Sequence, residues 1–208
     1  MSSWWERHIV PKLIRCACSQ GQFMKLRGRV VPNAAGDVLE LGCGGGINME
    51  FYRPSRVTSL TGLDPSPELL DMSRAAAQAR GIDADIKSGI GEAMPFEDAR
   101  FDTVVTTFTL CSVTEQAAVL AEIRRVLKPG GVALFLEHGA APDAGVATWQ
   151  RRIEPVWKRI GGNCHLTRPI GDAYEQAGFA VEREGAHYMP KTARPFGWVE
   201  YGAARVMG

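Results

Sequence analysis

The sequence predicts an α/β domain in which helices cover both faces of a mostly parallel β-sheet. Apolar, strand-like stretches alternate with amphipathic, helix-like stretches along most of the chain, and this alternation is typical of parallel sheets. One strand-like stretch, residues 38–41, runs directly into a glycine-rich turn at residues 42–46. A chain of 208 residues is long enough for one domain with a well-covered core.

Composition narrows the classes of function. The formal net charge of +1 and the hydrophobic content of 45% are ordinary for a soluble protein and give no reason to expect a nucleic-acid partner. No apolar run approaches the roughly 18–20 residues that cross a bilayer, and the N-terminus lacks a signal-peptide pattern. The five cysteines include no Cys-x-x-Cys pair, so we expect a cytoplasmic protein without a metal site or disulfide framework.

The first 32 residues differ from the rest because six basic residues accompany a single acidic one. Residues 3–6 have the pattern of a capping box, which predicts that a helix begins there, and Pro11 predicts a kink or two short helices. We interpret residues 1–32 as a helical cap on a domain formed by residues 33–208. The alternatives are a lid that closes the substrate pocket, with Trp5 as a lining residue, and a helix at a membrane surface.

The glycine-rich turn predicts a site for a nucleotide-like cofactor. Gly42, Gly44 and Gly46 lack a Cβ, so the backbone can adopt positive φ and a ligand can approach it closely. We expect a helix from Asn48, whose first N–H groups would favour a negative group. A dinucleotide fingerprint requires glycine where this chain has Ile47, and the Gly-Lys-Ser/Thr of a P-loop is missing.

Glu40 stands two residues before the first glycine, and the pattern Glu-x-Gly-x-Gly-x-Gly resembles motif I of class I S-adenosylmethionine (SAM) methyltransferases. The resemblance implies SAM as the cofactor, S-adenosylhomocysteine as the product, and a cofactor site at Glu40, Gly42, Cys43, Gly44 and Gly46. It also implies the Rossmann-like, three-layer fold of that class, a seven-stranded sheet whose last two strands form an antiparallel hairpin.

The second strand-like stretch, residues 57–63, ends at Asp64. A carboxylate at the tip of this strand can accept both hydroxyls of a ribose, and we expect Asp64 to do so with Pro65 beside it. The alternative role of Asp64 is to cap the helix that begins near Ser66 and ends at Gly81.

A third strand is expected over residues 83–88. The following residues, 89–96, resemble the Gly-Asp-Ala-x-x-Leu-Pro-Phe stretch with which many of these methyltransferases hold the adenine. Ile90 replaces the acidic residue that often meets the adenine amino group there. The resemblance therefore implies that Glu92, or backbone groups near Gly91, takes this role.

The fourth strand is expected over residues 101–108, with Thr107 near the cofactor. Its end lacks the Asn/Asp-Pro-Pro-Tyr sequence that would indicate methylation of a base amine or an amide. A helix over residues 115–127 follows. The sequence LKPGG at residues 127–131, before a fifth strand over 132–137, is a common landmark of the class.

The rest of the chain supplies the last elements of the predicted sheet. We expect two helices and the antiparallel hairpin there, at residues 149–160, 172–177, 179–184 and 198–206.

The second half also carries Trp157 and four short stretches, TLCSV (109–113), LEHG (136–139), GNCHLTR (162–168) and YGA (201–203). Together these resemble the methyltransferase-like family seven proteins of animals. That family is associated with S-methylation of small thiols, including hydrogen sulfide, so the resemblance implies a thiol or sulfide acceptor.

Other acceptors and roles stay open. Bacterial relatives with similar patterns methylate phosphatidylethanolamine or quinones, which makes N- or C-methylation at a membrane surface the alternative reaction. A SAM-binding module without catalysis is the non-enzyme alternative. We expect a monomer or homodimer that acts on a small molecule and makes peripheral membrane contact at most.

Methyl transfer from a sulfonium is an in-line displacement, which a protein promotes by positioning its reactants and removing water. A thiol with a pKa of about 8.5 must lose a proton to become a good nucleophile. His138 and His165 are the candidate bases, because a histidine of pKa about 6.5 is neutral at pH 7. Both have structural alternatives, such as holding a loop. We expect Cys111 and Tyr201 to line the substrate pocket.

Overall fold

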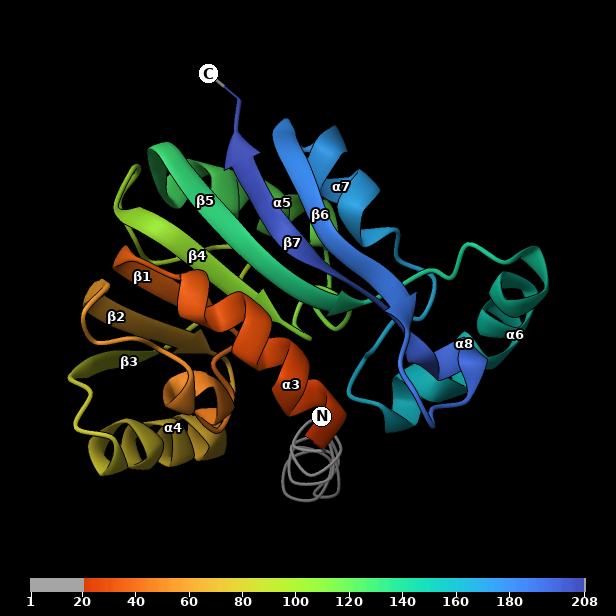
Figure 1. Cartoon of the computed structure of the whole chain (residues 1–208), viewed down its shortest axis with the longest axis horizontal. Helices are drawn as coiled ribbons and strands as arrows, with labels where there is room; N and C mark the ends of the chain where they lie inside the picture. The colour runs from red at the N-terminus through yellow and green to blue at the C-terminus, as the bar shows by residue number, and fades with distance from the viewer. Residues whose placement is uncertain (1–20, 208) are drawn as a thin grey trace.

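The computed structural model describes residues 21–207, and its seven strands join one sheet in the order β3-β2-β1-β4-β5-β7-β6 (Figure 1). The strands are β1 (Gly36–Leu41), β2 (Val57–Asp64), β3 (Ala84–Ser88), β4 (Phe101–Thr107), β5 (Leu127–His138), β6 (Phe179–Tyr188) and β7 (Trp198–Val206). The strands β1 to β5 pair in parallel, and β7 runs antiparallel to both of its neighbours. The predicted sheet with its antiparallel C-terminal hairpin is confirmed. Trp5 and the helix expected from residue 3 lie outside the described residues.

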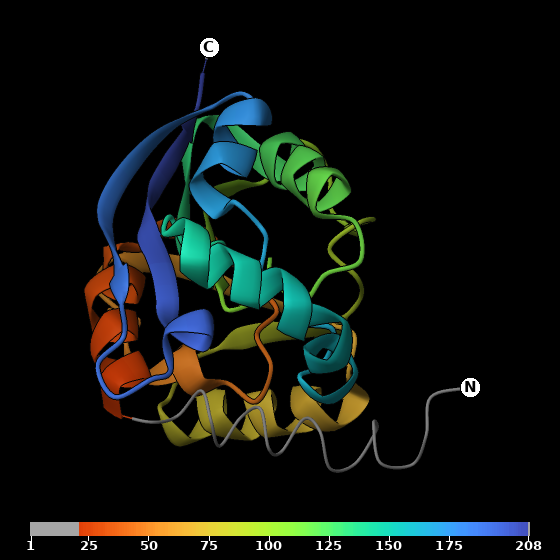
Figure 2. The same cartoon turned by 90° about the vertical axis from the view of Figure 1, so that its right-hand side faces the viewer.

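Helices cover both faces of this sheet (Figures 1 and 2). The helices are α3 (Gly21–Val30), α4 (Pro67–Ala79), α5 (Gln116–Val126), α6 (Ala144–Ile160), α7 (Ile170–Gln176) and α8 (Arg194–Gly197). Of these, α3 and α4 lie on one face and α5 and α7 on the other, while α6 and α8 lie together beyond one end of the sheet (Figure 1). No helix within residues 21–207 is both long and apolar enough to cross a membrane.

Two hydrophobic cores form because successive residues of a strand point to opposite faces of the sheet. In β1, Val38 packs into the core under α3 and α4, whereas Leu39 packs into the core under α5 and α7. The side chains of Leu26 and Val30 in α3 belong to the same core as Val38. The described part of the predicted N-terminal cap therefore packs directly on the domain.

The prediction of a helix beginning at Asn48 is wrong. The glycine loop is followed by a single turn of 3₁₀ helix, η2 (Ile47–Glu50), and no α-helix forms between this loop and β2. Pro54 explains the early end of this turn. In a continuing α-helix the ring of Pro54 would clash with the carbonyl four residues earlier, and proline also disfavours helical backbone at Arg53.

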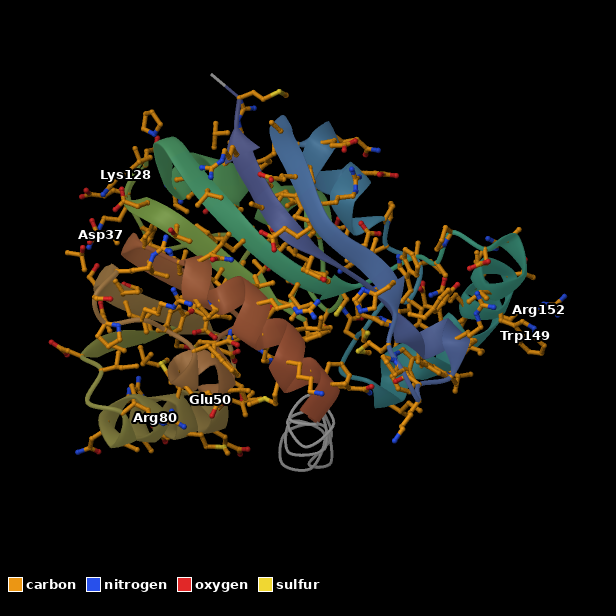
Figure 3. The ribbon with its side chains drawn as sticks, viewed as in Figure 1. Asp37, Glu50, Arg80, Lys128, Trp149 and Arg152 are labelled. Carbon is orange, nitrogen blue, oxygen red and sulfur yellow. The ribbon has the colours of Figure 1, made fainter. Side chains whose placement is uncertain are left out.

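The LKPGG sequence lies at the edge of the sheet where the parallel strands begin. Lys128 Nζ donates to Asp37 Oδ2 at 2.9 Å and to Asp102 Oδ2 at 2.8 Å. Lys128 therefore connects the starts of β1, β4 and β5, and Figure 3 shows it beside Asp37. The hydrogen bond from Lys128 lowers the pKa of Asp102. This landmark of the sequence therefore has a structural role, remote from the carboxyl ends of the strands.

Candidate cofactor and acceptor site

A cavity of about 440 Å³ opens at the carboxyl ends of β1, β2 and β4. The strand order reverses between β1 and β4, and open α/β sheets bind their ligands at such a switch point. The volume falls within the roughly 300–1,000 Å³ typical of small-molecule sites. The cavity is lined by Arg27, Gly162 and residues that include 40–45, 63–66, 89–92, 107–109 and 112–114.

The glycine loop after β1 forms one wall of the cavity. Gly42 has a φ of +70°, and its N–H donates to the Leu63 carbonyl at 2.8 Å. A Cβ at residue 42 would overlap the side chain of Thr109, so glycine allows the loop after β4 to approach here. Gly46, with a φ of +73°, lies outside the cavity lining, and a Cβ there would lie 2.7 Å from the Ala76 Cβ. Gly46 thus lets the loop pack against α4, whereas we predicted a contact with the cofactor.

Asp64 lines the cavity at the end of β2. Its Oδ2 accepts the Gly44 N–H at 3.0 Å, and its Oδ1 accepts the Ser66 N–H at 2.9 Å. Burial raises the pKa of Asp64, and these two backbone hydrogen bonds oppose that effect. The carboxylate therefore connects the glycine loop to the start of α4 while remaining part of the cavity wall.

The stretch after β3 supplies a further wall. Ile90 lines the cavity and is 51% exposed, which leaves an apolar side chain at its mouth. Glu92 also lines the cavity, and its Oε1 accepts the N–H groups of Thr114 at 2.8 Å and Glu115 at 3.2 Å. These two N–H groups immediately precede α5, and a carboxylate near the N-terminus of a helix is stabilised by the helix dipole. Glu92 therefore holds the backbone that leads into α5 and fixes the neighbouring wall.

Glu40 is buried beneath the glycine loop. Its Oε1 accepts a hydrogen bond from Asn48 Nδ2 at 2.9 Å, and its Oε2 accepts one from the Tyr52 hydroxyl at 2.9 Å. Desolvation raises the pKa of Glu40 to about 7, although both hydrogen bonds and the charge of Arg27 act in the opposite direction. Glu40 thus anchors η2 from below and forms the floor of the cavity.

Sequence reasoning missed Arg27, which enters the cavity from α3. Its Nη1 donates to Asn48 Oδ1 at 2.7 Å and to Thr107 Oγ1 at 2.6 Å, and its guanidinium carbon lies 5.2 Å from the centre of the Phe108 ring. The side chain is only 4% exposed. We counted Arg27 among the basic residues of the N-terminal segment, but it places a buried positive charge beside the end of β4.

Two residues predicted for the substrate pocket are not among those that line the cavity. Tyr201 lies in β7 on the α3 face of the sheet, where its hydroxyl is 3.1 Å from Arg29 Nη1 and its ring meets His187 edge-on. Cys111 is buried directly behind Ser112, which does line the cavity.

The two candidate catalytic histidines also lie outside the cavity lining. His138 is buried at the end of β5, with Nδ1 3.8 Å from Cys164 Sγ. His165 Nδ1 lies 3.6 Å from Glu154 Oε1, and its backbone N–H donates to the Cys111 carbonyl at 2.7 Å. Burial, followed by the charge of Arg168, lowers the pKa of His165. A catalytic role for either histidine stays a prediction.

Comparison with known proteins agrees with this geometry. Residues 39–135 match the family model described as a methyltransferase domain. Thiol S-methyltransferase TMT1B of Rattus norvegicus is 40% identical over 176 residues, which cover 82% of this chain and 68% of that protein. The chain belongs to the same family of SAM-dependent methyltransferases. Phosphatidylethanolamine N-methyltransferase of Cereibacter sphaeroides is 30% identical to this methyltransferase over 61% of the chain and 62% of its own length.

Solved structures support the fold of this methyltransferase. A SAM-dependent methyltransferase from Aquifex aeolicus superposes with a TM-score of 0.65 at 15% identity, over 95% of this chain and 98% of that one. SAM is the cofactor because the chain belongs to the family of SAM-dependent methyltransferases, and the cavity suits it. Gly42 brings backbone close to the cavity, Asp64 offers a carboxylate at the end of β2, and Arg27 offers a cation.

Proposed function

We propose that this methyltransferase transfers the methyl group of SAM to the sulfur of a small thiol or of sulfide. The observation that carries the proposal is the 40% identity to a thiol S-methyltransferase over most of the chain. The sequence resembles that family most specifically at residues 109–113 and 162–168. Both stretches contribute to the cavity, the first through Ser112 and Val113 and the second through Gly162. The acceptor would enter along this wall.

Hydrogen bonds hold these two stretches together. Arg168 donates to the carbonyls of Leu110 at 2.5 Å and Val113 at 2.7 Å, and Asn163 Nδ2 donates to the Ser112 carbonyl at 2.9 Å. A wall fixed in this way supports catalysis by positioning, because an in-line displacement proceeds only when the nucleophile approaches the methyl carbon within a narrow range of angles and distances.

The cavity residues suggest how the cofactor is held. We assign the ribose hydroxyls to Asp64, the adenine to the wall that carries Ile90 and Glu92, and the carboxylate of the methionine part to Arg27, since a guanidinium pairs well with a carboxylate. Glu40 acts indirectly, because one of its oxygens holds Asn48 of η2 and the other holds Tyr52, which follows η2.

The bound SAM supplies an electrophilic methyl group, and the protein must present a thiolate to it. A free thiol with a pKa of about 8.5 is only partly ionised at pH 7, whereas hydrogen sulfide ionises more readily. We retain His138 as the candidate base, with His165 second. His138→Ala is expected to lower the transfer rate while SAM affinity is preserved, and a fall in SAM affinity would instead assign His138 to the cofactor site.

Methyl transfer from isotopically labelled SAM tests the proposal directly. The purified protein is incubated with sulfide, small alkyl thiols, phosphatidylethanolamine vesicles and quinols in parallel, and labelled products are separated by mass spectrometry. Label on sulfur is the expected result. Label on the lipid amine or on a quinone carbon, without thiol turnover, would replace the proposal with the alternative favoured by the identity to the phosphatidylethanolamine enzyme.

The setting of the reaction is also a proposal. We infer a cytoplasmic monomer or homodimer that needs no nucleic-acid partner, in keeping with the formal net charge of +1.

A further inference from the structure

Residues 109–113 and 162–168, along which we propose that the acceptor enters, are called the acceptor wall. Three side chains with reactive chemistry meet behind its cavity-lining residues, although they are far apart in the sequence. Cys111 follows β4, His138 ends β5, and Cys164 follows α6. The thiols of Cys111 and Cys164 lie against each other, and Cys164 Sγ is 3.8 Å from His138 Nδ1. The backbone holds this arrangement, because the N–H of His165 donates to the Cys111 carbonyl at 2.7 Å.

The two thiols differ in accessibility. Cys111 is 3% exposed, whereas Cys164 is only partly buried in the turn between α6 and α7. A small molecule can therefore reach Cys164 first, and Cys111 stands behind it as the nearest second thiol. Cys43, the third cysteine among the described residues, is buried in the glycine loop and shows no such pairing.

The surroundings favour a negative charge on Cys164. Its pKa is lowered, first by the hydrogen bond with the Cys111 thiol and then by His138, while the same pairing raises the pKa of Cys111. The guanidinium of Arg168 adds a positive charge that interacts with both sulfurs. Thiolates next to cationic or imidazole groups are the reactive form of cysteine in proteins.

We propose that Cys164 is a thiol–disulfide exchange site for low-molecular-weight disulfides and that Cys111 is its resolving partner. Neither cysteine lines the methyl-transfer cavity, although His138 is also the candidate base for methyl transfer, and the test of this proposal does not depend on the methyl acceptor. The neighbours Ser112 and Gly162 line the cavity, so a bond between the two cysteines would link the two segments of the acceptor wall.

The chemistry balances with a disulfide RSSR as the oxidant. Cys164 first gives its proton to His138. The Cys164 sulfur then attacks one sulfur of RSSR and forms a bond to it, while the S–S bond of RSSR breaks. The released RS⁻ takes the proton from His138 and leaves as RSH. The Cys111 sulfur then attacks the Cys164 sulfur, and the second RS⁻ leaves with the Cys111 proton. Two electrons pass from the cysteines to RSSR, and the products are one internal disulfide and two RSH.

Oxidised glutathione serves as the probe. The full-length chain carrying Cys16→Ser and Cys18→Ser, which removes the two cysteines outside the described residues, is incubated with it at pH 7. Remaining thiols are then alkylated, and the products are analysed by intact mass and non-reducing peptide mapping. We expect the loss of two hydrogen atoms and a cross-linked peptide pair that contains Cys111 and Cys164, while Cys43 stays available for alkylation after denaturation.

Single substitutions in the same background separate the roles. Cys111→Ser is expected to stop the reaction at a stable glutathione adduct on Cys164, and Cys164→Ser is expected to leave Cys111 unmodified. His138→Asn should slow adduct formation about tenfold at pH 7, and the difference should shrink at pH 9, where the thiol ionises without help. Melting temperatures confirm that each variant is folded.

Several results would overturn the proposal. The first is that Cys43 is modified as fast as Cys164. The second is that an adduct forms on Cys111 in the Cys164→Ser variant. The third is that no adduct forms on Cys164 in a folded Cys111→Ser variant. Each would mean that the cluster is packed for stability and does not exchange with small disulfides.

Discussion

The guanidinium of Arg27 donates a hydrogen bond of 2.6 Å to Thr107 Oγ1 and thereby joins α3 to the carboxyl end of β4 at the cofactor cavity. The same nitrogen donates to Asn48 Oδ1, which follows the glycine loop. A helix that precedes the first strand thus contributes a side chain to the cavity formed at the strand ends. This relationship is the basis of the proposed role of Arg27 in binding the cofactor.

Arg27→Met is expected to weaken SAM binding by about 10- to 100-fold, or roughly 1.5–3 kcal/mol, because the cavity loses a charged hydrogen-bond donor. Isothermal titration calorimetry measures the change. Arg29→Met is the matched control, since Arg29 lies on the same helix but bonds to Tyr201 away from the cavity. Equal losses for the two variants would contradict a direct role of Arg27 at the cofactor.

Asp64→Ala is expected to weaken SAM binding by roughly 1.5–3 kcal/mol, because both the carboxylate for the ribose and the hydrogen bond that orders Gly44 are lost. Asp71→Ala is the control, since Asp71 lies on the exposed surface of α4 and pairs only with Arg74 among its described contacts. Unchanged affinity of the Asp64 variant by calorimetry would refute the ribose assignment.

Gly46→Ala is expected to destabilise the fold by about 2–4 kcal/mol. Alanine at residue 46 would adopt a positive φ and also press its Cβ against Ala76 of α4. Gly81→Ala is the control, because Gly81 has a φ of +66° but no atom near the position of a Cβ, so only about 1 kcal/mol is expected. Urea unfolding measures the free energy of unfolding of both variants. If Gly46→Ala lowers it no more than Gly81→Ala does, the result would count against the tight packing of Gly46 on α4.

Glu137→Gln is expected to stabilise the fold at pH 8 by up to about 3 kcal/mol and to leave it nearly unchanged at pH 4. Burial raises the pKa of Glu137 to about 7, from an ordinary value of 4.5. The native state therefore holds a proton between these two pH values that the unfolded state has lost, and the unfolding free energy of the parent protein falls as pH rises from 4.5 to 7.

The glutamine variant lacks this titration, and its side-chain oxygen can still accept the Thr109 N–H that bonds to Glu137. Denaturant unfolding of both proteins at pH 4, 6 and 8 measures the difference. A stability gap that stays constant across this range would show that Glu137 ionises normally in the native state.

The sequence was sufficient to predict the sheet and the edge of the sheet at which the cavity lies. Strand and helix patterns are local, so β2, β4, the last two strands and the loops at the strand ends could all be predicted from nearby residues. The antiparallel pairing of the last two strands was implied by the resemblance to class I methyltransferases. Asp64 could be predicted as well, because a carboxylate at the end of a parallel strand must lie at the ligand edge of the sheet. The helix after the glycine loop was predicted wrongly, because Pro54 ends the turn that begins there.

Only the tertiary structure decided which side chains enter the cavity and which lie behind it. Arg27 lies on a helix face whose apolar residues, Phe23, Leu26 and Val30, recur at helical spacing. An arginine on such an apolar face was the sequence signal that could have identified it. The turn of its side chain toward Thr107 depends on how α3 packs across the sheet, and that packing joins residues 80 positions apart.

The same holds for Cys111, His138 and Cys164. Each lies in a stretch that the sequence singled out, yet their meeting depends on the β4–β5 pairing and on the hydrogen bond between His165 and Cys111. The chain's local patterns therefore determined the scaffold and the ligand edge. Contacts between distant residues, which no local pattern encodes, determined which side chains lie at the cavity and which lie behind its wall.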